Sequence, residues 1–278
     1  MIFLQKQILL VCVCLLVLTG QAMADLLSDV QGVYAAGNYA KAAMLYRQLA
    51  EQGNAEAQFN LGLMLERGQG VPRDFHEAAV WYRQAAEQGN AKAQFNLGVM
   101  SDRGQGVPKD FHEAAKWYRL AAEQGSVEAQ FIFGMMNEIG RGVLQSDQEA
   151  VRWYRLAAEQ GHAISQARLG VMYANGQGIA QDDKEAARWY RQAAEQGNAT
   201  AQAALGVMYE YGRGVLQNYI LSHMWLNIAA SSAGSVDSEL QKPFIDKRNS
   251  VARQLTEQQI TQAQELAKKC IANSLRGC

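Results

Sequence analysis

Residues 67–89 read RGQGVPRDFHEAAVWYRQAAEQG, and residues 103–125 read RGQGVPKDFHEAAKWYRLAAEQG. The two stretches are identical at 20 of 23 positions and lie 36 residues apart. Such a match within one chain is typical of a repeat protein, in which each copy forms one small structural unit. Every short motif in these stretches therefore has to be interpreted as part of a repeating unit.

The same period continues through most of the chain. Glycine and tryptophan both recur at a step of 36 residues, at Gly62, Gly98, Gly134, Gly170 and Gly206, and at Trp81, Trp117, Trp153, Trp189 and Trp225. We expect five full repeats over residues 54–233. Residues 25–53 are expected to form a degenerate repeat before them, and residues 234–278 to form capping helices after them.

Each repeat is expected to contain two helices joined by a loop. Asn54 precedes apolar residues at helical spacing and Gly68 follows them, so the two residues predict the start and the end of the first helix. Asp74, with Glu77 three residues later, predicts a capping box at the start of the second helix. Gly89 is expected to end that helix.

Glycine inside a helix is unfavourable by about 1 kcal/mol relative to alanine, so Gly62 needs a separate explanation. We expect this position to allow the close approach of a neighbouring backbone. Alanine pairs such as Ala85 and Ala86 are expected to supply the facing surface.

Two parts of the quoted stretch resemble known binding or catalytic motifs, but the surrounding residues do not fit either motif. The Gly-x-Gly at 68–70 follows a predicted helix, and Arg73 stands where a dinucleotide-binding loop has its third glycine. His76 and Glu77 lack the second histidine of a zinc-protease motif, because Val80 stands there. No catalytic residue, metal or cofactor is therefore expected.

Composition favours an all-α fold and gives no reason to expect nucleic acid. The chain contains 26 Lys+Arg and 27 Asp+Glu residues, so its charge is close to neutral. It contains only three prolines among many Ala, Gln, Glu and Leu residues, which are good helix formers. A nucleic-acid partner is not expected from this balance of charge.

The first 24 residues differ from the rest. One lysine precedes an apolar run over residues 8–18, and the segment closes with Ala22, Met23 and Ala24. These features predict a signal peptide over residues 1–24, cleaved after Ala24. The mature chain is then expected to be exported and to carry no integral membrane segment, and an uncleaved membrane anchor is the alternative.

Signal cleavage would leave two cysteines, Cys270 and Cys278. In an oxidising compartment, two cysteines eight residues apart predict a disulfide. The alternative is a pair of free thiols in the C-terminal tail.

The pattern A-x-x-x-L-G-x-M, followed by G-x-G-V-x-x-D-x-x-E-A-x-x-W-Y-R-x-A-A-E-Q-G, recurs in register over residues 54–233. It resembles the Sel1-like repeat, a relative of the tetratricopeptide repeat. The resemblance implies an all-α fold, an α-solenoid that is a right-handed superhelix of 36-residue helix-turn-helix repeats. It also implies an exported scaffold or adaptor, periplasmic or alternatively secreted, which binds a protein or peptide on its concave surface without catalysis.

A second hypothesis comes from cysteine-rich members of the same family, which have been discussed as β-lactam-binding or β-lactam-hydrolysing proteins. The present repeats contain no cysteine pairs, and the chain has no Ser-x-x-Lys, Ser-Asp-Asn or Lys-Thr-Gly motif. A cell-wall-related hydrolase or β-lactam-binding protein therefore stands as the alternative function.

The first helix of each repeat supplies the candidate partner-binding residues. Its recurring glutamine lines a polar groove for a peptide or makes hydrogen bonds between repeats, and we favour the hydrogen bonds. Two other positions vary from repeat to repeat, as a specific binding surface requires. The candidates from these positions are Gln58, Asn60, Gln94, Asn96, Gln130, Arg168, Tyr173 and Tyr209.

Overall fold

The computed structural model describes residues 26–232, 238–275 and 277–278, and the predicted signal peptide lies outside them. The regular structure of the described residues is helical, which confirms the predicted all-α class. The chain divides into two compact units, an N-terminal unit, Met1–Ser126, and a C-terminal unit, Val127–Cys278.

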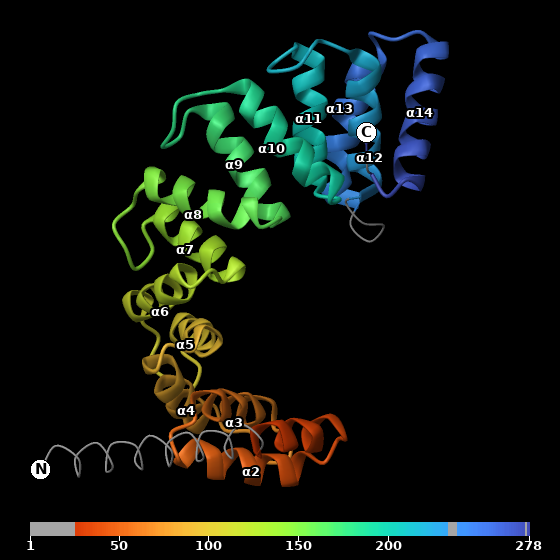
Figure 1. The fold of residues 1–278 in the computed structure, drawn as a ribbon. Coiled ribbons are helices and arrows are strands. Elements are labelled where there is room, and N and C mark those ends of the chain that lie inside the picture. The colour runs from red at the N-terminus through yellow and green to blue at the C-terminus, as the bar shows by residue number, and fades with distance from the viewer. Residues whose placement is uncertain (1–25, 233–237, 276) are drawn as a thin grey trace, which may run out of the picture. The chain divides into compact units, whose positions relative to one another are not determined.

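The N-terminal unit begins with a helix over residues 26–35. It continues with α2 (Tyr39–Glu51), α3 (Ala55–Arg67), α4 (Phe75–Glu87), α5 (Ala91–Arg103) and α6 (Phe111–Glu123). Helices α3 and α4 pack as a pair, as do α5 and α6, and α4 also packs on α5 (Figure 1). Each pair is thereby joined to the next through its second helix.

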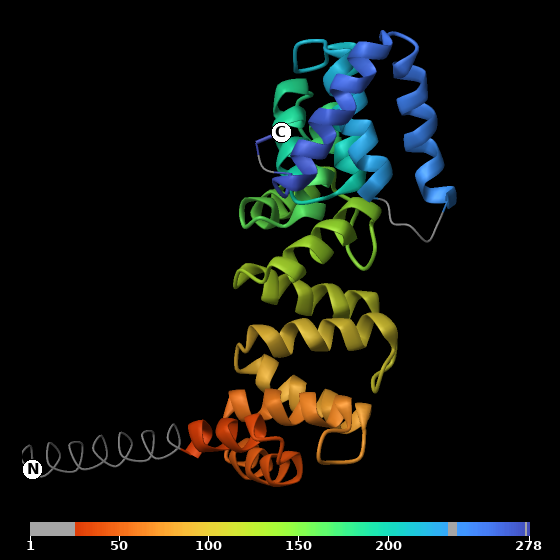
Figure 2. The same ribbon diagram turned by 90° about the vertical axis from the view of Figure 1, so that its right-hand side faces the viewer.

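The C-terminal unit continues the same arrangement. It contains α7 (Val127–Ile139), α8 (Asp147–Glu159), α9 (Ala163–Asn175), α10 (Asp183–Glu195), α11 (Ala199–Tyr211) and α12 (Tyr219–Ser232). The last two helices, α13 (Ser238–Ala252) and α14 (Glu257–Ala272), both pack on α12, and Figure 2 shows them in blue beside it.

We call the first helix of each repeat the A helix (α3, α5, α7, α9, α11) and the second the B helix (α4, α6, α8, α10, α12). Helix α2 has the place of a B helix before the first full pair. The predicted solenoid of 36-residue helix pairs is confirmed. The right-handed sense of its superhelix stays a prediction.

The helices begin at the predicted capping residues. The Asn54 side chain accepts a hydrogen bond from the amide of Ala57 (2.8 Å), and Asp74 accepts from the amides of His76 (2.8 Å) and Glu77 (2.9 Å). The second half of the capping box predicted at Asp74 is wrong, because the Glu77 carboxylate is used elsewhere, as described below. The Asp74 amide donates to the carbonyl of Leu65 (3.0 Å) instead.

The two glycines of the Gly-x-Gly motif have different roles. Gly68 ends α3 in the left-handed conformation, with φ of 69°. Gly70 is also left-handed, with φ of 72°, and a Cβ at this residue would collide with the carbonyl of Tyr39 in α2. The second glycine therefore lets the loop lie directly on the start of the preceding B helix. Sequence reasoning explained only the first of the two.

Gly62 is close to a side chain rather than to the alanines expected there. A Cβ on Gly62 would lie 2.8 Å from the ring of Tyr82 and 3.3 Å from the carbonyl oxygen of Ala78. The expected close approach is confirmed, and the nearest atoms belong to Tyr82 and Ala78 rather than to Ala85 or Ala86. The ring of Tyr82 occupies the space that the glycine leaves.

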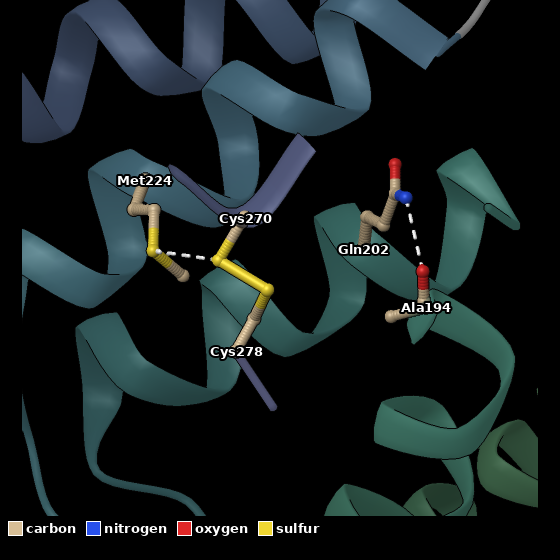
Figure 3. The surroundings of a disulfide bond; sticks show 5 residues. All are labelled: Ala194, Gln202, Met224, Cys270 and Cys278. Atoms are coloured by element: carbon tan, nitrogen blue, oxygen red, sulfur yellow. Dashed lines mark hydrogen bonds between the residues drawn. A yellow bond between two sulfur atoms is a disulfide. The ribbon is translucent and has the colours of Figure 1, made fainter. Parts of the chain in front are cut away.

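The disulfide predicted between Cys270 and Cys278 is present (Figure 3). Cys270 is buried at the end of α14, where its Sγ lies 3.9 Å from the Sδ of Met224 in α12. The bond therefore fixes the C-terminal residues beside the core formed by α10, α11, α12 and α14. A disulfide in a chain of this kind is typical of an oxidising compartment.

Candidate binding surface

Each A helix buries one of its sides in the core and leaves another side partly exposed. In α3, Leu61 and Met64 are buried, whereas Asn60 and Leu63 are half-buried and lie one turn apart on the same face. We call the equivalent positions of all five A helices the A-helix surface. It comprises Asn60, Leu63, Asn96 and Val99 in the N-terminal unit, and Ile132, Met135, Arg168, Val171, Ala204 and Val207 in the C-terminal unit.

The recurring glutamines lie inside the scaffold. Gln58, Gln94 and Gln130 are each 3 % exposed. The amides of Gln58 and Gln94 donate to the last turn of the preceding B helix, at the carbonyls of Ala50 (3.1 Å) and Ala86 (3.0 Å). The interpretation as a hydrogen-bonding position between repeats is confirmed.

A second glutamine completes this arrangement from the end of the B helix in the same repeat. Gln88 donates to the side-chain oxygen of Gln58 (2.7 Å), and Gln160 donates to that of Gln130 (2.8 Å). In the last repeat Ser232 stands at the equivalent position. The buried side-chain oxygen of Gln202 then finds no hydrogen-bond partner among the described residues.

Three candidates lie where a partner can reach them. Asn60 and Asn96 are half-buried on α3 and α5, and Asn96 reaches the hydroxyl of Tyr82. Arg168 is exposed on α9, and its guanidinium lies 3.8 Å from the carboxylate of Glu138 in α7. These three side chains belong to the position that varies from repeat to repeat.

The two tyrosine candidates are held by arginines of the preceding B helix. The hydroxyl of Tyr173, which is half-buried, accepts a hydrogen bond from Arg155 (2.9 Å). The hydroxyl of Tyr209, which is 8 % exposed, accepts one from Arg191. Each tyrosine therefore joins an A helix to the repeat before it, a contact that sequence reasoning did not foresee.

The A-helix surface is bordered by acidic residues that are engaged with buried tyrosines. The hydroxyl of Tyr82 donates to Glu66 and that of Tyr154 donates to Glu138, both at 2.6 Å. Burial is the main cause that raises the pKa of both phenols well above the ordinary value, and the adjacent carboxylates raise it further. These tyrosines therefore stay protonated as donors and do not act as acids or bases near neutral pH.

A carboxylate joins successive B helices in the N-terminal unit. Glu77 Oε1 accepts from Arg47 of the preceding B helix (2.6 Å) and from the indole of Trp81 in its own helix (3.2 Å). Glu113 Oε1 likewise accepts from Arg83 (3.0 Å) and Trp117 (2.8 Å). The hydrogen bond from Arg47 is the main cause that lowers the pKa of Glu77.

Two histidines, His76 and His112, occupy the same place in successive repeats, and His162 and His223 occupy two other places. His76 lies near the carbonyl of Gly106 (3.1 Å), and His162 caps α9 by accepting from the amide of Ser165 (3.3 Å). His223 is buried on α12. In the part of the chain that the structure describes, no group of three or more His, Cys, Asp or Glu side chains is placed to hold a metal ion.

Among the described helices, none combines the length and the apolar character that crossing a membrane requires. Within each unit, the repeats present their equivalent positions of the A-helix surface. Consecutive helix pairs with such a surface define an α-solenoid repeat protein, a class whose stacked units bind along an extended face.

The Sel1 repeat model matches six consecutive segments of the chain: 29–54, 55–90, 91–126, 127–162, 163–198 and 199–233. The chain belongs to the Sel1 repeat family. The first matched segment, 29–54, covers most of the stretch 25–53 that was interpreted above as a degenerate repeat. A comparison with curated proteins finds no match.

Solved structures of the same family are similar to this chain. A Sel1 repeat protein from Oxalobacter formigenes is 31 % identical with a TM-score of 0.70, and the match covers 80 % of this chain and 98 % of that one. The protein c5321, a protective antigen present in uropathogenic Escherichia coli strains, is 33 % identical with a TM-score of 0.67. That match covers 86 % of this chain, which spans only 53 % of the length of c5321.

Proposed function

We propose that this protein is an exported binding scaffold that holds a protein or peptide partner on its A-helix surface, with no covalent step. One observation carries the proposal. Of the two positions that vary between repeats, the one that holds Asn60 in the first repeat is accessible on this surface. The other is buried at Leu65, Ser101, Asn137 and Tyr209, as are the recurring glutamine and glycine of the same helices. Variation at an accessible position is what partner specificity requires.

The composition of the surface supports a protein partner. Leu63 and Val99 supply apolar area, and burial of such area in an interface is favourable by about 25 cal/mol per Å². Asn60 and Asn96 stand beside them and carry amides that both donate and accept hydrogen bonds. We assign direct contact with the partner to Asn60, Asn96 and Arg168 of the A-helix surface, and to Tyr173, which lies outside that surface but is half-buried on the same helix as Arg168.

The remaining candidates act indirectly in this proposal. Gln58, Gln94 and Gln130 are buried, so they position the A helices rather than touch a partner. Tyr209 is almost fully buried and does the same through Arg191.

Site-specific photo-crosslinking in the cells that produce the protein tests this proposal. A photoreactive residue is placed at Asn96 on α5, and the control is placed at Arg119, whose side chain is 55 % exposed on α6 of the same repeat. We expect a defined protein adduct from Asn96 and none from Arg119. Adducts from Arg119 alone would assign binding to the B helices and contradict the proposal.

The absence of catalysis is part of the proposal and has its own test. The mature chain is expected to leave the chromogenic β-lactam nitrocefin unchanged at any protein concentration. Turnover that scales with protein concentration would replace the scaffold by the alternative function, a β-lactam-hydrolysing protein.

Export is proposed from two observations. The disulfide is typical of proteins that mature outside the cytoplasm. The similar protein c5321 is a protective antigen, and antibodies have to reach an antigen. We expect the mature protein in the periplasmic fraction, with an N-terminus at Asp25. Recovery from the culture medium would assign it to the secreted alternative, and an intact Met1 in the cytoplasm would contradict export.

A further inference from the structure

The carboxylate that joins successive B helices is missing from the last repeat. In the first full repeat Glu77 binds Arg47 and Trp81, and in the second Glu113 binds Arg83 and Trp117. In the last repeat Leu221 stands at this position. The arginine that would face a carboxylate here, Arg191, is nevertheless present.

The intervening repeats show how the pattern changes. Glu149 and Glu185 keep the carboxylate, but they bind Arg152 (3.5 Å) and Arg188 (2.9 Å) of their own helices. Among the five full repeats, only the last therefore has an uncharged residue at this position. The buried indole N–H of Trp225 finds no hydrogen-bond partner within the described part of the chain, and the same is true of Trp153 and Trp189 in the repeats whose glutamate binds its own helix.

An open pocket lies where Arg191 meets the last repeat. It has a volume of about 330 Å³ and extends from α10 to Gly214 and Val215, in the loop before α12. Three cationic side chains of α10 line it, Lys184, Arg188 and Arg191, at a spacing that places them on one face of the helix. Glu195 lies at the far end of the same face.

The pocket has positive charge and hydrogen-bond donors that are available to an anion. Arg188 is paired with Glu185, and one N–H of Arg191 is used by Tyr209. The guanidinium of Arg191 has four further N–H donors, and Lys184 contributes a second positive charge. A planar guanidinium binds a carboxylate in a forked geometry, the type of ligand that the equivalent arginines Arg47 and Arg83 already bind.

We propose that this pocket binds a carboxylate presented by an acidic side chain of a partner protein. The ligand carboxylate gives Arg191 the partner that Glu77 and Glu113 give to Arg47 and Arg83 in the first two repeats. Arg191 is its main contact, and Lys184 and Arg188 add positive charge around it. The site lies on a B helix and does not depend on the A-helix surface, so each proposal can fail without the other.

Calorimetric titration of the purified mature chain with an acidic tripeptide tests the site. The probe is acetylated and amidated tri-glutamate, and the matched tri-glutamine peptide is the neutral control. We expect binding of tri-glutamate only, weakened about tenfold by Arg191→Gln. The control variant Arg155→Gln, in the same position one repeat earlier, also loses a bond to a tyrosine hydroxyl and should leave affinity within about twofold.

A second pair of variants tests whether a carboxylate supplied by the protein itself competes with the peptide. Leu221→Glu restores the carboxylate that the first four repeats carry, so it should bind Arg191 and abolish tri-glutamate binding. Leu221→Gln has nearly the same shape without the charge and should bind the peptide as the wild-type chain does. Thermal unfolding checks that both variants are folded.

Four outcomes would overturn the proposal. The wild-type chain fails to bind tri-glutamate at millimolar concentration, or it binds tri-glutamine equally well. Arg155→Gln weakens binding as much as Arg191→Gln does. Inorganic phosphate binds with the same affinity and the same dependence on Arg191, which would make the pocket a general anion site.

Discussion

Glycine is a poor residue for the interior of a helix, yet Gly62 lies in the middle of α3 because the ring of Tyr82 fills the space beside it. The recurrence of glycine every 36 residues indicated that this position needs a small residue. The side chain that requires it, Tyr82, belongs to another helix and could not be identified from the period. The same holds for Glu77, whose local role as a capping residue was predicted and whose actual partners are Arg47 and Trp81. Contacts across helices cannot be read from helical spacing alone.

Gly62→Ala is expected to destabilise the protein by about 1–3 kcal/mol, because the new methyl group forces the ring of Tyr82 to move. Gly32→Ala is the matched control. Gly32 lies in the helix over residues 26–35, and a Cβ there meets no described atom within 4 Å. This control should stabilise the protein by about 0.5–1 kcal/mol through helix propensity. Denaturant unfolding measures both changes, and a neutral or stabilising Gly62→Ala would contradict the role assigned to Tyr82.

His223 is expected to make stability depend on pH. The residue is 3 % exposed on α12, and burial, together with the charge of Arg248, lowers its pKa below the ordinary 6.5. The unfolded chain therefore binds a proton that the folded chain does not, and stability falls as the pH drops through about 6.5 toward the folded pKa. His223→Ala introduces the residue that Ala79, Ala115 and Ala187 supply in other repeats. The variant should lose less stability than the wild type between about pH 7 and pH 5, and parallel losses would contradict the prediction.

At the scale of the elements, the sequence predicted the helices well because their boundaries are local. The caps at Asn54 and Asp74 satisfy backbone amides within three residues, and Gly68 ends α3 through its own backbone conformation. The loop glycine Gly70 was not explained, because its neighbour Tyr39 belongs to the preceding repeat. The A-helix surface could be proposed from its variable positions, but only the structure separated the accessible Asn60 from the buried Gln58.

The cap at Asp110 is expected to stabilise α6 measurably. Its carboxylate accepts from the amides of His112 (2.8 Å) and Glu113 (3.1 Å). Asp110→Ala should lower the free energy of unfolding by about 1 kcal/mol, whereas Asp110→Asn keeps a side-chain acceptor and should lower it by only a few tenths. Equal losses from the two substitutions, measured by denaturant unfolding, would show that charge rather than capping stabilises the helix start.

At the scale of the molecule, each unit is a series of neighbouring contacts, and the C-terminal unit closes with α13, α14 and a disulfide. The disulfide was predictable because the predicted signal cleavage would leave two cysteines. The pocket beside Arg191 was not, because the role of the repeated carboxylate, which binds an arginine of the preceding B helix, became visible only in the structure.

Loss of the disulfide is expected to destabilise the C-terminal unit by about 2–3 kcal/mol, the size that the chain-entropy model gives for a short loop. Cys278→Ser removes the bond and leaves Cys270 in its buried place. Denaturant unfolding of the wild type with reductant should match that of the variant without it. A wild-type chain that unfolds at the same denaturant concentration with and without reductant would contradict this prediction.

The central claim is that the A-helix surface binds a partner protein. The most direct measurement is the equilibrium affinity of the partner recovered by crosslinking for Asn60→Lys and Arg119→Gln variants of the purified chain. The first variant places a charged side chain on the A-helix surface, and the second changes an exposed residue of a B helix. We predict that Asn60→Lys weakens binding about tenfold or more while Arg119→Gln changes it less than about twofold. An unchanged affinity with Asn60→Lys, together with a clear loss with Arg119→Gln, would contradict the account.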